Sequence, residues 1–384
     1  MRERGRRLIA ALCASALIVL PAAPARADRI RDDQWHLRYL RVAEAHRIST
    51  GAGVTVAVID TGVDPHPDLR DNVLPGRETF PGGTGDGRQD ADGHGTGMAG
   101  LIAAHGRGPG TGALGVAPGA KVLSLRYTEA AGEETTDSKA VATSINIAAL
   151  RVTEVICMPF GGGSSVEEIR ALDTAIKADA VVVAAAGNRP NSTSVGFPAS
   201  YEGVVAVGAS DRNGNRASIS VTGPQLALVA PGVDIYSTSR DGRYRRGTGT
   251  SDATAIVAGA AALVRSRFPD LSAAEVVHRL TATATDRGLP GRDPEYGYGE
   301  LNLLAALTAD VPPLAPSGSA DPTPDANSPT AGSPSVAARE PRRDTGERVL
   351  TGIVVSVAAL LSVAVALVLF VPRLRRRSPD DDAR

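Results

Sequence analysis

Residues 56–64, VAVIDTGVD, contain the end of the strand that decides the fold. From Val54 to Ile59 the side chains are almost all apolar and mostly β-branched, which is typical of a strand buried on both faces in a parallel sheet. Asp60 follows at the carboxyl end, where open α/β sheets carry their sites. We therefore expect a doubly wound α/β domain with Asp60 in its site.

Two further blocks place a histidine and a serine beside glycines. They are residues 92–100, DGHGTGMAG, and residues 247–259, GTGTSDATAIVAG. From Ala253 to Val264 the residues are small or apolar, without proline or internal charge, which predicts a helix. The glycines and threonine before it form a tight entry that presents the hydroxyl of Ser251.

Asp60, His94 and Ser251, in this order along the chain, can form a nucleophilic triad that cuts amide bonds. A serine hydroxyl is a poor nucleophile until an imidazole takes its proton, and His94 is the candidate base. Asp60 would hold the imidazole in the required tautomer and stabilise its protonated form. Each block alone could be a helix cap or a turn, but their coincidence favours a site.

Residues 181–188, VVVAAAGN, predict a fourth component. The valines form a buried strand that runs into Gly187 and Asn188. The Asn188 amide and the backbone N–H of Ser251 could both donate to an oxyanion, and the alternative role for Asn188 is a turn residue. Losing one such donor typically costs about 2.7–4 kcal/mol of barrier stabilisation.

From Gly53 to Leu307 the chain resembles the subtilisin-type (S8) serine peptidases, on the strength of these blocks and their order. This resemblance implies a subtilisin-like three-layer α/β fold with a mostly parallel central sheet, and serine endopeptidase activity. The opening residues 34–51, QWHLRYLRVAEAHRISTG, and a carboxyl-terminal anchor more narrowly resemble the mycosins. Mycosins are membrane-anchored subtilases associated with type VII secretion in actinobacteria.

Residues 155–163, VICMPFGGG, resemble the family strand whose edge pairs with the substrate backbone. Pro159 removes one backbone donor from this edge and could weaken binding. Cys157 is expected to be a small buried apolar group, with a reactive thiol as the alternative. The resemblance implies that small residues from two strand ends border the specificity pocket: Phe160, Gly161, Gly162, Ala185, Ala186 and Gly187.

Asp252 directly follows the nucleophile, where the family usually has an apolar side chain. A carboxylate at a helix start is favoured by the helix dipole, so an exposed charge of this kind is the simpler interpretation. Alternatively, Asp252 lies close to the oxyanion, favours the protonated form of His94 and attracts a basic residue after the scissile bond.

The amino-terminal residues 1–27 have an arginine-rich start, an apolar stretch and an Ala-Arg-Ala end, which predict a cleaved signal peptide. An uncut anchor is the alternative. Residues 28–310 are assigned to the peptidase domain, whose first 23 residues are too few for a separate inhibitory pro-domain. We expect that extension to pack on the body, rather than form a disordered tail, through Trp35, Leu37, Leu40 and Val42.

The carboxyl-terminal part predicts a tether. Residues 311–347 are rich in Pro, Ser and Ala and should form a disordered linker. Residues 349–372 form a charge-free apolar run long enough to cross a bilayer, with a buried core helix as the alternative. Four arginines, Arg373, Arg375, Arg376 and Arg377, directly follow this run, which places the tail 373–384 in the cytoplasm and the catalytic domain outside.

Composition excludes other classes of function. The formal net charge is -1 and aromatic residues make up 3%, without a basic stripe, so a nucleic-acid groove is not expected. Cys157 would be the only thiol of the mature chain, which leaves no intramolecular disulfide.

Residues 77–90 are expected to be a flexible loop. The acidic residues 86–92 could bind calcium but lack the alternating ligand pattern, so no metal or cofactor is assigned.

These observations predict a membrane-tethered, extracytoplasmic serine endopeptidase in the cell membrane, and the resemblance to the mycosins implies that it processes limited substrates of a type VII secretion system. Its expected partners are a protein or peptide substrate, components of the secretion complex, and the membrane through the single carboxyl-terminal helix. One alternative is a largely non-proteolytic scaffold for that complex. Another is a general degradative peptidase, which fits the triad but not the anchor.

Overall fold

The computed structural model describes residues 28–130, 137–151 and 153–314, and a parallel sheet forms its centre. The seven strands lie in the order β2-β3-β1-β4-β5-β6-β7. The strand predicted from its apolar run is β1, which pairs in parallel with β3 and β4. The strands are β1 (Thr55–Asp60), β2 (Val73–Glu78), β3 (Lys121–Arg126), β4 (Val155–Met158), β5 (Val181–Ala185), β6 (Val204–Ser210) and β7 (Leu226–Pro231).

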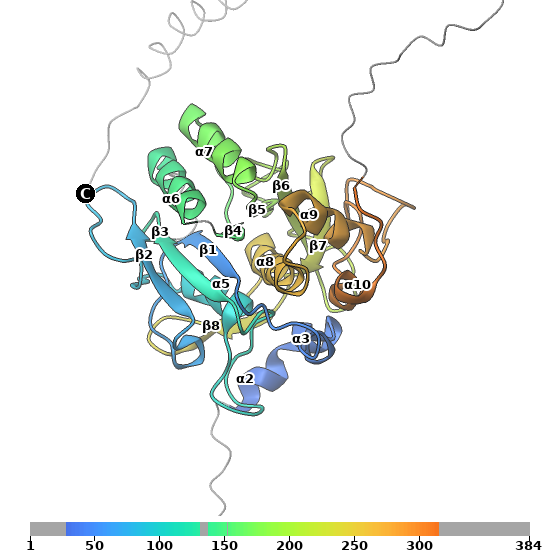
Figure 1. The fold of residues 1–384 in the computed structure, drawn as a ribbon, viewed down its shortest axis with the longest axis horizontal. Helices are drawn as coiled ribbons and strands as arrows, with labels where there is room; N and C mark the ends of the chain where they lie inside the picture. The colour runs from blue at the N-terminus through green and yellow to red at the C-terminus, as the bar shows by residue number, and fades with distance from the viewer. Residues whose placement is uncertain (1–27, 131–136, 152, 315–384) are drawn as a thin grey trace, which may run out of the picture. The chain divides into compact units, whose positions relative to one another are not determined.

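Helices cover both faces of this sheet (Figure 1). On one face lie α6 (Ser138–Leu150) and α7 (Val166–Lys177), and on the other lie α5 (His94–Ala103) and α8 (Thr250–Arg267). The alternation of strand side chains creates the two cores. Val56 and Val58 face α5 and α8, whereas Ala57 and Ile59 face α6 and α7. The predicted three-layer α/β arrangement is confirmed.

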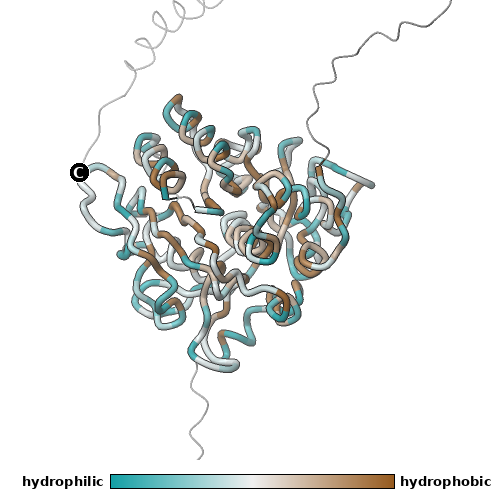
Figure 2. The backbone as a smooth tube through the Cα atoms, in the orientation of Figure 1, coloured by the Kyte–Doolittle hydropathy of each residue, from teal (hydrophilic) through white to brown (hydrophobic). Residues whose placement is uncertain are grey.

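Hydropathy follows these layers, with the hydrophobic segments concentrated in the strands and the inner faces of the helices (Figure 2). Helix α8 is buried along nearly its whole length, from Thr250 to Arg265. Two short helices, α9 (Ala273–Ala282) and α10 (Leu303–Thr308), pack against the same core as α8. The helix predicted from the small apolar run after Ser251 is therefore the central helix of this layer.

The order of the strands creates the place for a site. From β1 the chain passes to β2 and β3 on one side, and it then crosses to β4 on the other side. Helices that leave adjacent strands in opposite directions open a crevice at the carboxyl ends of those strands. Asp60 ends β1 at this point, beside the residues that follow β4 and β5.

The amino-terminal extension packs on the body as three short helices, α2 (Asp28–Asp33), α3 (Trp35–Tyr39) and α4 (Val42–Ala45). All four predicted anchor side chains are buried, so the packed arrangement is confirmed and the disordered tail is wrong for this segment. The Trp35 indole Nε1–H donates to the carbonyls of Val233 (3.1 Å) and Asp234 (3.2 Å).

Strand β2 corrects one sequence-based expectation. Residues 77–90 were predicted to be a flexible loop, but Arg77 and Glu78 belong to β2. Glu78 is almost fully buried and accepts a hydrogen bond from Arg126 at 2.6 Å. The prediction failed here because β2 is an edge strand, which tolerates the Pro75 and Gly76 that obscure a strand pattern.

A small antiparallel hairpin leads into the central helix. It consists of β8 (Ile235–Thr238) and β9 (Tyr244–Gly247), and β9 ends three residues before α8 begins.

No helix in the described ranges is long and apolar enough to cross a membrane. The predicted signal peptide, the predicted transmembrane segment 349–372 and the tail 373–384 lie outside those ranges, as does the predicted linker beyond residue 314.

Candidate active site

A cleft of about 740 Å³ opens at the carboxyl ends of β1, β4 and β5. All ten residues assigned to the site from the sequence line it. The lining also includes polar residues that the sequence did not indicate, Thr61 and Arg245 among them. The complete lining is Asp60, Thr61, His94, Tyr127, Pro159, Phe160, Gly161, Gly162, Ala185, Ala186, Gly187, Asn188, Asn191, Ser192, Gly196, Arg245, Thr248, Thr250, Ser251 and Asp252.

Asp60 and His94 are joined by hydrogen bonds. The Nδ1 atom of His94 lies 2.9 Å from both carboxylate oxygens of Asp60. The Asp60 carboxylate also accepts from the backbone N–H of Thr61 at 2.7 Å. A carboxylate on Nδ1 favours the tautomer with its proton there, which leaves Nε2 as the basic atom.

The electrostatic environment favours the protonated imidazole. Burial alone would lower the pKa of His94, but the charge and hydrogen bond of Asp60 outweigh it, so the pKa is raised above its ordinary value. The nearby charges of Arg245 and Asp252 act on it in opposite directions. A raised pKa makes the imidazole a stronger proton acceptor.

His94 is held in place because the first turn of α5 is tied to a buried carboxylate, that of Asp90. One oxygen of Asp90 accepts from the N–H of Gly93 (2.8 Å) and the hydroxyl of Thr61 (2.8 Å). The other accepts from the N–H and hydroxyl of Thr96, at 2.8 and 2.6 Å. The free N–H groups at a helix start need such acceptors. Asp90 was missed in the sequence because it lies outside the glycine-flanked block.

Ser251 occupies the second position of α8 and is 9% exposed. Its backbone N–H is among the first four of the helix, which have no acceptor inside the helix. The N-cap residue is Gly249, which supplies no side-chain cap. The start of α8 therefore offers the cleft a hydroxyl together with a backbone donor.

The side chain of Asn188 is oriented by Thr250. Its Oδ1 atom accepts from the Thr250 N–H at 2.9 Å and from the Thr250 hydroxyl at 3.2 Å. Because one end of the amide is occupied in this way, the Nδ2 donor points away from Thr250. Asn188 and Ser251 line the same cleft, so two N–H donors are available there.

The opposite part of the cleft is built from the ends of β4 and β5. The ring of Phe160 packs against Tyr127, with centroids 4.7 Å apart. The N–H of Gly162 donates to the carbonyl of Phe197 at 2.8 Å, and both Gly161 and Gly162 are exposed. Cys157 lies behind this surface, fully buried in β4, as expected for a small apolar group.

Asp252 differs from its simpler interpretation as an exposed helix-start charge. It is 1% exposed, and its Oδ1 atom forms an ion pair with Arg245 Nη1 at 3.3 Å. Burial raises the pKa of its carboxyl despite the opposing charge of Arg245. Arg245 was not anticipated, because the ion pair depends on how β9 turns into α8.

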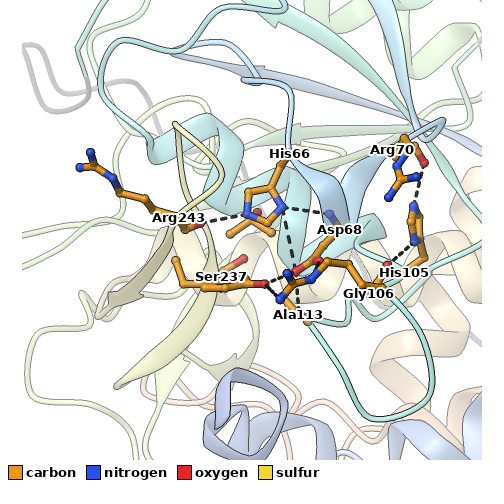
Figure 3. Close-up of polar contacts among 12 residues, drawn as sticks. His66, Asp68, Arg70, His105, Gly106, Ala113, Ser237 and Arg243 are labelled. Atoms are coloured by element: carbon orange, nitrogen blue, oxygen red, sulfur yellow. Dashed lines mark hydrogen bonds and ion pairs between the residues drawn. The ribbon is translucent and has the colours of Figure 1, made fainter. Parts of the chain in front are cut away.

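A second polar cluster, around His66 and Asp68, contacts the residues at the start of β9 (Figure 3). The buried ring of His66 donates from Nε2 to the Arg243 carbonyl at 3.0 Å, and its Nδ1 accepts from the Asp68 N–H at 3.0 Å. The hydroxyl of Tyr244 donates to Asp68 at 2.8 Å. Within the described ranges, no three acidic, histidine or cysteine side chains are grouped to hold a metal ion.

Comparison with known proteins gives consistent matches. Residues 51–299 match the model of the subtilase family. The chain is 42% identical to subtilisin DY of Bacillus licheniformis over 261 residues, which cover 67% of this chain and 91% of that protein. It is 36% identical to mycosin-1 of Mycobacterium tuberculosis over 337 residues, covering 73% of this chain and 74% of that protein.

Solved structures agree with these matches. The structure of MycP1 with its N-terminal propeptide removed superposes with a TM-score of 0.64 at 34% identity, covering 73% of this chain and 98% of that one. The structure of the MycP3 protease from the type VII (ESX-3) secretion system has a TM-score of 0.64 at 35% identity. It covers 72% of this chain and 88% of that one.

Proposed function

This chain belongs to the subtilase family and is a subtilisin-like serine endopeptidase of the mycosin type, and we propose that Asp60, His94 and Ser251 are its catalytic triad. The observation that carries the proposal is the double contact of Asp60 with His94 Nδ1, 2.9 Å from each oxygen, in a cleft that also holds Ser251. In this assignment Asn188 and the Ser251 N–H form the oxyanion hole.

The reaction follows from these positions. The Ser251 hydroxyl oxygen attacks the peptide carbonyl carbon while His94 Nε2 takes the hydroxyl proton. The oxyanion that forms accepts hydrogen bonds from Asn188 Nδ2 and the Ser251 N–H. The C–N bond then breaks as His94 returns its proton to the leaving amine. A water molecule repeats the sequence on the acyl-serine and releases the acid.

The peptide would bind with its acyl part between the ends of β4 and β5. Phe160, Gly161 and Gly162 form one border and Ala185, Ala186 and Gly187 the other. Gly161 is exposed at the strand end, so its backbone is accessible to an extended peptide. Proline at position 159 leaves a carbonyl but no N–H, which restricts pairing there to acceptance.

Labelling with a fluorophosphonate tests the triad directly, because this reagent reacts with an activated serine. The wild-type protein should be labelled, while Ser251→Ala and His94→Ala should not. A Ser192→Ala variant removes another hydroxyl from the cleft and should still be labelled. Labelling that persists in Ser251→Ala, or that is absent from correctly folded wild type, would contradict the assignment.

We further propose that the enzyme is tethered to the membrane by residues 349–372, with its catalytic domain outside the cytoplasm and residues 373–384 inside. Support comes from the charge-free run, the arginines that follow it, and the similarity to mycosin-1 and to proteases of type VII secretion systems. Its substrates would be a limited set of proteins handled by such a system. Protease added to intact cells should degrade the catalytic domain but spare a tag at the carboxyl terminus.

A scaffold that stabilises the secretion complex is the competing function. The buried carboxylate of Asp252, directly after the nucleophile, is the observation that favours it, because negative charge opposes a developing oxyanion. In cells that carry Ser251→Ala, a processing enzyme predicts accumulation of uncut substrate. A scaffold predicts normal secretion with Ser251→Ala and loss of secretion only when the whole protein is removed.

A further inference from the structure

We infer that Arg245 binds a substrate carboxylate immediately after the scissile bond, so that the enzyme prefers an acidic residue at that position. The inference rests on the proposed triad, because that triad defines which side of the cleft holds the leaving group. It replaces the alternative expectation of a basic residue there. That expectation considered the negative charge of Asp252 but not its ion pair with Arg245.

The Arg245 side chain lies on the leaving-group side. It crosses the first turn of α5, where a Cβ atom added at Gly97 would lie 2.7 Å from both its Cδ and Nη1. Gly97 follows His94 by one helical turn. Since His94 delivers its proton to the leaving amine, the residue after the scissile bond must pass close to this turn.

The ion pair presents its positive end to the cleft. Arg245 is 23% exposed, whereas Asp252 is 1% exposed. The contact between them is a single hydrogen bond of 3.3 Å from Nη1, and a guanidinium has five N–H donors. A substrate therefore meets a guanidinium that has further N–H donors available, with the almost fully buried carboxylate of Asp252 behind it.

The chain makes room for this arrangement. A Cβ atom at Gly247 would lie 2.7 Å from both carboxylate oxygens of Asp252, so a larger residue at 247 would displace the pair. On the far side, the Tyr244 hydroxyl and the carbonyl of Arg243 are held by Asp68 and His66. Strand β9 is thus fastened next to Arg245, which fixes where its guanidinium can reach.

The Asp252 carboxylate uses only one of its two oxygens in the ion pair with Arg245. Within the described ranges, its buried Oδ2 atom has no hydrogen-bond partner. A buried carboxylate with one free oxygen leaves the ion pair partly satisfied in the free enzyme. A carboxylate from the substrate adds a second acceptor to Arg245, whereas a lysine would be repelled by the exposed guanidinium.

Three matched peptides test the inference. They carry a carboxyl-terminal amide and differ only in Glu, Gln or Lys after the scissile bond, which mass spectrometry of the products identifies. The wild-type enzyme should cleave the Glu peptide with a kcat/KM about 10-fold or more above that of the Lys peptide. Arg245→Gln should bring this ratio to about 1 or below, because it leaves the Asp252 carboxylate without its partner, and Arg245→Glu should invert it. Comparing ratios within each variant cancels any general loss of activity.

Arg246→Gln is the control, since Arg246 sits next in β9 but pairs with Asp234 at 2.5 Å and does not line the cleft. It should keep the wild-type ratio. If Arg245→Gln does not fold, Arg245→Gln with Asp252→Asn removes both charges and should lose the preference equally. A labelled, active wild type with equal rates on all three peptides would overturn this inference alone. A folded wild type that is not labelled would overturn the proposed function instead.

Discussion

Helices α5 and α8 both begin at the cleft, but their first turns are used differently. In α5 the N–H groups of Gly93 and Thr96 are taken by Asp90, and that of Gly95 is taken by the Thr61 hydroxyl at 3.0 Å. In α8 the Thr250 N–H donates to the side chain of Asn188 at 2.9 Å. In the proposed mechanism, the first turn of α5 holds the base His94 in position, while the start of α8 keeps the Ser251 N–H available for the substrate.

The largest effect is expected from removing the Nδ2 donor of Asn188, whose side chain is bonded to the start of α8. Asn188→Ala should lower kcat about 10²- to 10³-fold with little change in KM, a range that comes from subtilisin, a member of this family. Asn188→Asp retains an acceptor for Thr250 but not the Nδ2 donor, so it should be as slow. Thr250→Val removes the hydroxyl that steadies Asn188 and should cost less. Kinetics on one peptide separate the three, and a fully active Asn188→Asp would exclude the donor role.

A substitution at the start of α5 should instead lower the stability of the folded protein. Asp90→Ala leaves several buried N–H and O–H donors around α5 without an acceptor, and we expect the free energy of unfolding to fall by about 2–3 kcal/mol. Urea denaturation measures the change. Asp86→Ala is the control, because the Asp86 side chain is 43% exposed and pairs locally with Arg88. An equal loss for both variants would contradict the buried role of Asp90.

A smaller effect is expected where β9 approaches α8. Tyr244→Phe removes one hydrogen bond to the buried carboxylate of Asp68 and should lower the free energy of unfolding by about 1 kcal/mol. Tyr298→Phe provides the comparison, since Tyr298 is 45% exposed and its ring lies against Arg292. If Tyr244→Phe is as stable as Tyr298→Phe, Asp68 does not fasten β9 through this hydroxyl.

The smallest expected effect is a displacement of the pH profile. His94 accepts a proton only when neutral, and its pKa is raised, so kcat/KM should fall with decreasing pH through a value above the ordinary imidazole pKa. The charge of Asp252 contributes to raising the pKa of His94, so Asp252→Asn should move this limb to lower pH. Measuring kcat/KM of both proteins between about pH 5 and 9 tests this shift. A limb that stays in place or moves upward would show that Asp252 does not act on His94.

The sequence predicted the parts of the site that have a local signature. Asp60 ends a β-branched strand, and His94 and Ser251 are flanked by glycines, so composition alone indicated that they lie at strand and helix ends. The fold class followed from the same strands. Their meeting in one cleft depends on the parallel order of β1, β4 and β5, which the family resemblance implied and the structure contains.

What the sequence did not indicate depends on the path of the chain in three dimensions. Asp90 looked like the end of a polar loop, but it is buried because α5 needs acceptors for its first turn. Arg245 and Asp252 are seven residues apart, and their pairing requires β9 to enter α8 past a glycine. Strand β2 lacks a strand pattern because only one of its edges is paired.

The amino-terminal helices have a consequence for how the protein is made. Trp35 bonds to a carbonyl 198 residues later, and the Tyr39 hydroxyl bonds to Glu300, 261 residues later. A chain that emerges from its amino terminus exposes this indole long before its acceptors have been synthesised. Closing such long loops is slow, because the chain loses conformational entropy before any stabilising contact has formed. Folding of the domain should therefore not be complete until residue 300 has been synthesised. Shorter nascent chains should remain sensitive to proteolysis.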